Sequence, residues 1–156
     1  MYKHIKRRTQ PLWTVEGFLE PLAPKIERLR AEIGKNIKIL ADVNVKHSWP
    51  IGSPTMDYIV KECCERAQPD AVIVTGARTG EAPAIEEVLR ARESSKVPVI
   101  VGSGMTAENL ELYWKLAEGF IVGSYIRVSG VAGNPIDPQR VERFMKNVNE
   151  LRSATP

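Results

Sequence analysis

The stretch that decides the fold is a short apolar run that turns polar toward its end: Ile37-Lys38-Ile39-Leu40-Ala41-Asp42-Val43-Asn44-Val45-Lys46-His47-Ser48. Side chains alternate across a strand with a period of two, so the isoleucine, alanine and valine positions share one apolar face. Polar groups gather near the carboxyl end, at Asp42, Asn44, Lys46 and His47. Because parallel α/β proteins bind ligands at the carboxyl ends of their strands, these four residues are the first candidates for chemistry.

Outward from this run, helical and strand patterns alternate along the chain. Apolar residues at helical spacing predict a helix over about 21–33, and Ser53-Pro54 predicts the start of a second helix as N-cap and first-turn proline. Three further apolar runs predict buried strands, each followed by a helical pattern: 71–74, 97–101 and 120–122. Asp137-Pro138 predicts the start of the last helix.

This alternation predicts an α/β protein whose parallel strands are joined by right-handed crossovers. Two architectures fit: an open, four-stranded flavodoxin-like sheet, or a half-barrel that resembles the C-terminal half of a TIM barrel. Glycine turns follow both of the last two strands. They favour the (β/α)₄ half-barrel, because the usual phosphate site of a complete barrel is built from the loops after strands seven and eight.

The length and the charge predict one domain with a short basic extension. A chain of 156 residues fits a single core. Its formal charge of +3 owes much to four basic residues within residues 1–12, which we expect to form a frayed N-terminal tail before a single domain over 13–156. Elsewhere basic residues alternate with glutamates, which disfavours a nucleic-acid binder.

Other function classes are disfavoured by what the sequence lacks. No apolar run approaches the roughly 20 residues of a transmembrane helix, and we expect no transmembrane segment. The N-terminus has no secretory pattern and the adjacent Cys63 and Cys64 cannot form a disulfide framework, so we expect a cytoplasmic protein. His4 and His47 are the only histidines and lack clustered acidic partners, so no metal site is predicted.

The glycine turns carry the most direct chemical signal. Gly102-Ser103-Gly104 and Gly123-Ser124 end two neighbouring strands, and backbone N–H groups in such turns bind phosphate oxygens without a formal cation. Arg127 adds a positive charge nearby. The alternative is that these glycines only permit tight turns. For the preceding loop, with Thr75, Gly76, Thr79 and Gly80, turn chemistry and ligand contact fit the sequence equally well.

The polar end of the first strand is the candidate for catalysis. The carboxylate of Asp42 and the ammonium group of Lys46 share a strand face, as a base and an electrophile would. A Schiff base at Lys46 is a less favoured version of the same idea. The alternative is a structural ion pair, because buried charges are usually paired.

Several ordered motifs together resemble the BtpA/SgcQ family over about residues 15–151. They are Ala41-Asp42-Val43-Asn44-Val45-Lys46-His47, Asp70-Ala71-Val72-Ile73-Val74-Thr75-Gly76 with Thr79-Gly80, Val101-Gly102-Ser103-Gly104 with Thr106, and Gly119-Phe120-Ile121-Val122-Gly123-Ser124 with Asn134 and Asp137. The resemblance implies a TIM-type barrel of the ribulose-phosphate-binding kind. One class of members is linked to photosystem I biogenesis, and another sits among sugar-metabolism proteins.

The chain departs from the family in length, since it resembles only the C-terminal half of a complete barrel. A half-barrel leaves strand edges unpaired and its inner face open. We therefore expect a homo-oligomer that closes a barrel, a separate N-terminal half that completes it, or a truncated gene product. Residues contributed by the missing strands would be absent, whereas the phosphate motifs lie wholly within this half.

These observations predict a phosphate-ligand-binding barrel protein of the BtpA/SgcQ type that acts on a phosphorylated sugar or nucleotide-like metabolite. One alternative is a non-catalytic photosystem I biogenesis or stability factor. Another is a binder of flavin mononucleotide (FMN), whose phosphate suits the same loops. The sequence specifies no cofactor, substrate or reaction.

Overall fold

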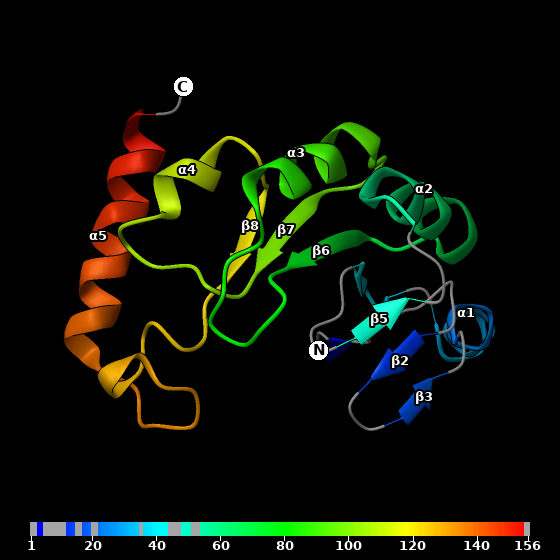
Figure 1. Cartoon of the computed structure of the whole chain (residues 1–156), viewed down its shortest axis with the longest axis horizontal. Helices are drawn as coiled ribbons and strands as arrows, with labels where there is room; N and C mark the ends of the chain where they lie inside the picture. Colours follow the sequence, from blue (N-terminus) through cyan, green and yellow to red (C-terminus); the bar gives the residue numbers. More distant parts are fainter. Residues whose placement is uncertain are drawn as a thin grey trace.

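The fold is carried by a five-stranded parallel sheet (Figure 1). The computed structural model describes residues 3–4, 12–14, 17–19, 22–34, 36–43, 48–50 and 54–154. The strands lie in the order β1-β4-β6-β7-β8, and every neighbouring pair is parallel. Their bounds are β1 (Lys3–His4), β4 (Ile39–Asp42), β6 (Ala71–Thr75), β7 (Val99–Gly102) and β8 (Gly119–Ile121).

The strand order decides between the two predicted architectures. Neighbours in the sheet follow the order of the chain without reversal, which is the winding of a (β/α) barrel, whereas a flavodoxin-like sheet reverses its order at a switch point. The α/β half-barrel prediction is therefore confirmed, and the open flavodoxin-like alternative is wrong.

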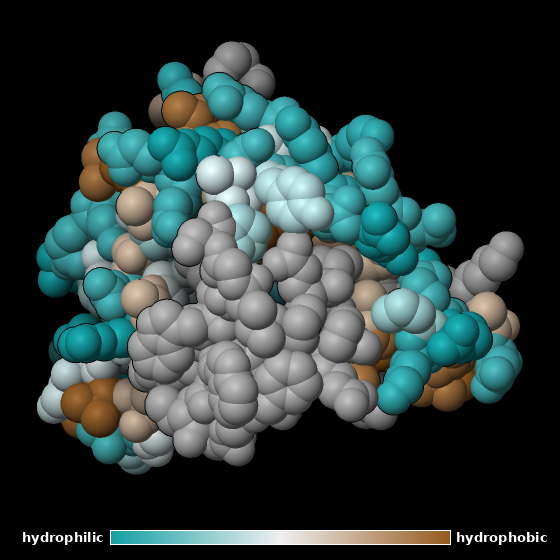
Figure 2. Space-filling view, turned by 45° about the vertical axis from the view of Figure 1, so that its right-hand side comes forward, coloured by the Kyte–Doolittle hydropathy of each residue, from teal (hydrophilic) through white to brown (hydrophobic). Residues whose placement is uncertain are grey.

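Helices cover one face of this sheet. They are α1 (Ala23–Ile33), α2 (Met56–Ala67), α3 (Ile85–Ser94), α4 (Leu110–Trp114) and α5 (Pro138–Ala154), with a short 3₁₀ turn η1 (Val128–Gly130) before α5. Strand side chains on this face are buried with apolar helix residues in one core, among them Val72, Val74, Val99 and Val101. The outer surface of the helix layer is mostly hydrophilic (Figure 2).

No helix in the described part of the chain combines the length and apolar character that a membrane crossing requires.

The register of the strands places polar residues on the opposite, inner face. Asp42 pairs with Ile73, while Thr75 lies opposite Gly102 and Gly102 lies opposite Ile121. Because side chains alternate along each strand, these positions point away from the helix-covered core. The carboxyl ends of four adjacent strands therefore bring one carboxylate, one hydroxyl and one glycine together on one side of the sheet.

A second sheet was not predicted from the sequence. It is antiparallel, has the order β3-β2-β5, and consists of β2 (Leu12–Thr14), β3 (Gly17–Leu19) and β5 (Ser48–Pro50). Two residues of the segment expected to be a frayed tail form β1, which pairs with β4. The division of the chain into a tail over 1–12 and a domain over 13–156 stays a prediction.

Several predicted boundaries differ from the structure. The strand predicted over 37–48 is β4, which ends at Asp42, because its pairing with β6 ends where Asp42 meets Ile73. Helix α2 starts after Thr55 rather than at Ser53-Pro54. Helix α5 does start as predicted, because Oδ1 of Asp137 accepts hydrogen bonds from the N–H groups of Gln139 and Arg140 at 3.0 and 3.3 Å.

Candidate functional site

A pocket of about 410 Å³ opens at the carboxyl ends of β4, β6, β7 and β8. This is the end of a parallel sheet at which barrel enzymes bind their ligands. The loop that follows β8 closes one side with Ala132 and Gly133.

Most of the residues proposed from the sequence line this one pocket. They are Asp42, Thr75, Thr79, Gly80, Gly102, Ser103, Gly104, Gly123, Ser124 and Arg127. Gly76 is not among the lining residues. Asn44, Lys46 and His47 lie outside the described residues. Seven lining residues had not been proposed as site residues: Ile73, Met105, Thr106, Ile121, Tyr125, Ala132 and Gly133. Met105 and Tyr125 had a positional signal in the sequence, because they directly follow Gly104 and Ser124. Ile73, Thr106 and Ile121 lie within the motifs that carry the family resemblance.

The turn after β7 is held rigidly by its own chain. Both Ser103 and Gly104 have positive φ angles, +83° and +66°. A Cβ atom on Gly104 would collide with the backbone of Glu81 and Ala82, so glycine is required there both by the φ angle and by this close approach. Gly76 meets the same constraint, because a Cβ atom on it would collide with the carbonyl oxygen of Glu81.

Hydrogen bonds from the side chain of Asn109 connect this turn to the start of α4. Its side-chain oxygen accepts the N–H of Thr106 at 2.8 Å, and its amide nitrogen donates to the carbonyl oxygen of Gly104 at 2.9 Å. The hydroxyl oxygen of Thr106 in turn accepts the N–H of Asn109 at 3.2 Å. Thr106 and Asn109 thus hold each other at the entry to the helix, and α4 itself begins at Leu110.

The turn after β8 is more open. A Cβ atom on Gly123 would meet no atom within 4 Å. Gly123 is two residues beyond Ile121, which lines the pocket, so strand alternation directs this open space toward the pocket. The hydroxyl oxygen of Ser124 lies 4.0 Å from the position that a Cβ atom on Gly80 would take. The loops after β6 and β8 therefore meet beside the turn after β7.

Backbone donors in both turns have no acceptor in the part of the chain that the structure describes. Among the described residues, the N–H groups of Ser103, Gly104, Gly123 and Ser124 donate to no carbonyl oxygen or side chain. The hydroxyl groups of Ser103 and Ser124 likewise make no hydrogen bond within that part of the chain. Polar groups at a protein site are normally paired, so this edge of the pocket is a set of donors ready for an external acceptor.

Arg127 is the cation among the described residues that line the pocket. Its backbone N–H donates to the carbonyl oxygen of Ser124 at 3.0 Å, and its Nη1 donates to the carbonyl oxygen of Asn134 at 2.5 Å. An isolated antiparallel bridge to Ile136 also holds this segment in place. Within the described residues its guanidinium faces no carboxylate at ion-pair distance, so its charge is available to an anion.

Asp42 supplies the pocket's carboxylate, two strands away from the turn after β7. Its side chain is 4% exposed, and its Oδ1 accepts a hydrogen bond from the Thr75 hydroxyl at 3.3 Å. Thr75 is also 4% exposed. This buried pair lies on the inner face of the sheet, at the ends of β4 and β6.

Tyr125 forms the rim between the pocket and α5. The Arg140 guanidinium lies 4.7 Å from the centre of its ring, and its hydroxyl donates to Glu108 at 3.4 Å. Glu108 also pairs with Arg143 at 2.7 Å. The pKa of Glu108 is lowered mainly by the hydrogen bond from its own backbone N–H and by that of Thr106. Burial opposes them, and Arg143 and Tyr125 lower the pKa further.

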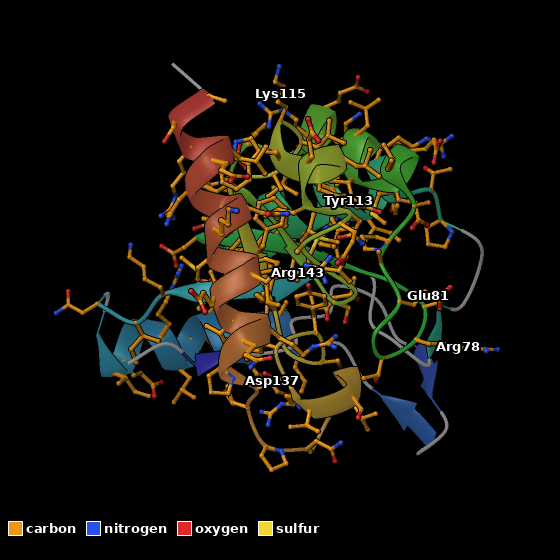
Figure 3. All side chains as sticks on the ribbon, turned by 90° about the vertical axis from the view of Figure 1, so that its left-hand side faces the viewer. Arg78, Glu81, Tyr113, Lys115, Asp137 and Arg143 are labelled. Atoms are coloured by element: carbon orange, nitrogen blue, oxygen red, sulfur yellow. The ribbon has the colours of Figure 1, made fainter. Side chains whose placement is uncertain are left out.

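The loop after β6 is anchored on one side and exposed on the other. The buried Tyr113 hydroxyl donates to the carbonyl oxygen of Pro83 at 2.7 Å, and burial raises the pKa of Tyr113, with Glu86 adding to the effect. Figure 3 shows Arg78 on this loop, directed outward. Arg78 does not line the pocket.

Nowhere in the described part of the chain do three metal-ligating side chains of the His, Cys, Asp and Glu types gather.

Comparison with known proteins gives a family match and close relatives. A model described as the BtpA family matches residues 5–150, a range that begins earlier than the resemblance of the motifs. An uncharacterized protein of Pyrococcus abyssi is 41% identical over 140 residues, which cover 90% of this chain and 53% of that protein. The photosystem I biogenesis protein BtpA of Synechocystis sp. is 35% identical over 144 residues, which cover 92% of this chain and 50% of that protein.

The chain spans about half the length of the curated relatives it matches. Among solved structures, a thiamine phosphate pyrophosphorylase from Pyrococcus furiosus superposes with a TM-score of 0.56 and 20% sequence identity, over 85% of this chain and 56% of that one. At this identity the likeness shows the fold alone. It agrees with the barrel winding of the sheet.

Proposed function

The chain belongs to the BtpA family, and from that premise we propose that its pocket binds the phosphate group of a small phosphorylated metabolite. The observation that carries this proposal is the set of four backbone N–H groups in the turns after β7 and β8 that have no acceptor in the described part of the chain. A phosphate monoester has three terminal oxygens that accept such hydrogen bonds.

The charge and shape of the pocket support the same ligand. Arg127 provides a full positive charge beside the turn after β8, and the hydroxyl groups of Ser103 and Ser124 add donors on both sides. Gly123 leaves space at which a ligand can approach the backbone closely. Thr79 and Gly80 complete this side of the pocket from the loop after β6.

An activity on a phosphorylated sugar or nucleotide-like metabolite is the corresponding enzymatic proposal. Asp42 is a buried carboxylate that lines the pocket, and in this proposal it acts as a base or orients the ligand. Asn44, Lys46 and His47 follow it in the sequence, and their contribution stays a prediction.

The test is a pair of matched glycine substitutions titrated with inorganic phosphate by calorimetry. Gly123→Ala adds a methyl group where the protein leaves open space, so it should fold normally and lower the affinity about tenfold or more, which corresponds to about 1.4 kcal/mol. Gly119→Ala, on β8 just before this turn, is the control, because its Cβ atom would make an ordinary 3.7 Å contact with Ile100 outside the pocket.

The two variants give a clear decision. If Gly119→Ala binds phosphate like the unmodified chain and Gly123→Ala does not, the turn after β8 contacts the anion. If the unmodified chain binds no phosphate, or if Gly123→Ala binds it equally well, the phosphate proposal is wrong.

A role in photosystem I biogenesis is the second candidate function. The observation that favours it is the relative of that name, whose similarity extends over 92% of this chain. Co-purification of the tagged chain with photosystem I subunits, together with no turnover of phosphorylated metabolites, would favour a non-catalytic role. Turnover of such a metabolite without co-purification would favour the enzyme.

Closure of the half-barrel by another polypeptide is the associated partner proposal. In the described sheet β8 pairs only with β7, and Ile121 on its inner face is 42% exposed although it lines the pocket. We propose that a second copy or a separate N-terminal half covers this edge. The mass of the chain in solution, alone and with an N-terminal half supplied, tests both versions.

A further inference from the structure

We propose that Arg140 is a positioning residue of the phosphate site, and that it holds the turn after β8 in the shape that presents its donors to the anion. Arg140 lies near the start of α5 and does not line the pocket. It therefore acts on the ligand through the backbone of this turn. The inference rests on the proposed function, because it takes Gly123 and Ser124 as contacts of the phosphate.

The two turns of the phosphate site are supported from different parts of the chain. The turn after β7 is held by a close neighbour, because the amide of Asn109 bonds to the carbonyl oxygen of Gly104 five residues earlier. In the turn after β8, the side chain among the described residues that bonds to the backbone is that of Arg140. Its Nε donates to the carbonyl oxygen of Tyr125 at 2.5 Å. Arg140 is thus the counterpart of Asn109.

The side chain of Arg140 is itself held in place. The backbone N–H of Arg140 donates to Oδ1 of Asp137 at 3.3 Å, and its guanidinium lies 4.7 Å from the centre of the Tyr125 ring. Its Nη2 lies 3.3 Å from the position that a Cβ atom on Gly130 would take. Because the guanidinium is enclosed between this ring and the loop, Nε meets its acceptor in a fixed place.

Three successive carbonyl groups of this turn each accept one hydrogen bond. Their donors are the N–H of Arg127 to Ser124 at 3.0 Å, Nε of Arg140 to Tyr125 at 2.5 Å and the N–H of Asp137 to Ile126 at 2.9 Å. Figure 3 shows Asp137 where the loop after β8 enters α5. A planar trans peptide directs its N–H opposite to its C=O, so these bonds fix the direction of the whole segment that follows Gly123. The bond from Arg140 is the one that a side-chain substitution removes.

The charge of Arg140 provides a competing explanation. In the part of the chain that the structure describes, its guanidinium faces no carboxylate at ion-pair distance, so it also adds positive potential at this end of the sheet. Lysine separates the two effects. It keeps the charge, but it places the methylene group Cε where arginine has the donor Nε.

The experiment titrates the full chain and its variants with inorganic phosphate by calorimetry. We expect Arg140→Met and Arg140→Lys each to lower the affinity about fivefold, which is the usual effect of one lost hydrogen bond. Lys146→Met is the control, because it removes a positive charge from an exposed position of the same helix and should leave the affinity unchanged. Melting temperatures establish that each variant is folded.

Double variants show through which turn Arg140 acts. Arg140→Met combined with Ser124→Ala should lower the affinity by less than the product of the two single effects, because both change the same turn. Combined with Ser103→Ala, in the other turn, the two effects should multiply. A role in folding stability alone would lower the melting temperature and leave the phosphate affinity of the folded variants unchanged.

The possible failures are distinguishable. A normal affinity in Arg140→Lys, or an equal loss in Lys146→Met, would overturn the positioning role, because charge alone would then account for the effect. Effects that multiply fully with Ser124→Ala would overturn it too. These results leave the phosphate site standing, whereas no phosphate binding by the unmodified chain would overturn both proposals. If Arg140→Met does not fold, Arg140→Lys, which keeps the charge and the aliphatic stem, decides alone.

Discussion

The two ends of the parallel sheet differ in whether their backbone hydrogen-bond donors are paired within the described chain. At the amino end, acidic side chains accept strand N–H groups: Asp70 accepts that of Ile39 at 2.8 Å and Glu118 accepts that of Val99 at 2.7 Å. Arg30 and Lys38 lie 3.1 and 2.9 Å from Asp70, and Arg92 lies 3.5 Å from Glu118. At this end the chain satisfies its own polar groups.

At the carboxyl end the described chain leaves donors unsatisfied in two successive turns. Unpaired polar groups cost free energy unless water or a ligand pairs with them. The amino end therefore contributes to folding stability, whereas the carboxyl end keeps its donors for binding. This division matches the general behaviour of barrel proteins, in which function sits at the carboxyl ends of the strands.

The largest change in folding stability is expected at Gly104, a residue of the carboxyl end that also supports the fold. Gly104 belongs to the binding end, yet its backbone packs against Glu81 and Ala82. We expect Gly104→Ala to lower the free energy of unfolding by about 3–5 kcal/mol, because it adds overpacking to the strain of a positive φ angle. Urea unfolding measures this loss.

Gly133→Ala is the matched control for that substitution. Gly133 also has a positive φ angle, +95°, but a Cβ atom there would meet nothing within 4 Å. Its cost should be limited to the backbone strain, about 1–2 kcal/mol. Equal costs for the two variants would show that the contact with Glu81 and Ala82 does not matter.

At the amino end of the sheet, Asp70 is the residue whose loss should cost the most folding stability. Asp70→Ala removes the acceptor of the Ile39 N–H group and leaves the half-buried Arg30 with fewer partners. We expect a loss of about 1–3 kcal/mol in unfolding free energy, and no change in the affinity for inorganic phosphate. Asp70→Asn, which keeps an acceptor oxygen, should lose less. A fall in phosphate affinity for Asp70→Ala would mean that the two ends are coupled.

A smaller effect of opposite sign is expected at Ser103. Its φ angle of +83° is strained for serine, so Ser103→Gly should raise the unfolding free energy by about 0.5–1 kcal/mol and lower phosphate affinity through the lost hydroxyl. Ser129→Gly is the control, since Ser129 also has a positive φ angle, +57°, and lies outside the pocket. It should be stabilised without any change in phosphate binding.

Ser103→Ala separates the two contributions. It removes the hydroxyl group and keeps the strain, so it should lower phosphate affinity without stabilising the fold. An unchanged affinity in both Ser103 variants would remove this side chain from the site.

Asp70, at the amino end of the sheet, should also make the stability of the fold depend on pH, and this effect is expected to be small. Burial alone would raise the pKa of Asp70, but the Ile39 N–H bond, the Lys38 bond and the charges of Lys38 and Arg30 together lower it below its ordinary value. A lowered pKa in the folded state means that this stabilisation is complete above about pH 4 and is lost as the pH falls through the folded pKa. Melting temperatures from pH 6 to pH 3 should decline less in Asp70→Asn. Parallel declines would contradict the assignment.

The parallel core was predictable because its sequence signals are local. Continuous apolar runs such as Ala71–Thr75 are typical of strands covered on both faces, and glycines mark where each run ends. Since every strand ends at the same edge of the sheet, residues from four separate turns were expected to lie together. The structure brings Asp42, Thr75, Ser103 and Ser124 to one pocket.

The remaining features depend on contacts between distant residues. The antiparallel sheet pairs Trp13 with Trp49, and strands of three residues are too short to show a period. The apolar alternation also continues past Asp42, although pairing with β6 ends there. The sequence also does not distinguish two kinds of glycine. A Cβ atom on Gly104 would collide with the chain's own backbone, whereas a Cβ atom on Gly123 would meet nothing within 4 Å.

The position of β8 at the edge of the sheet has a consequence for exchange of amide hydrogens. All five residues of β6 are buried between β4 and β7, whereas none of the three residues of β8 is fully buried and only β7 pairs with it in the described sheet. Local opening should therefore release β8 long before β6. A ligand held between the turns after β7 and β8 would slow deuterium uptake at β8 and leave the rate at β6 unchanged.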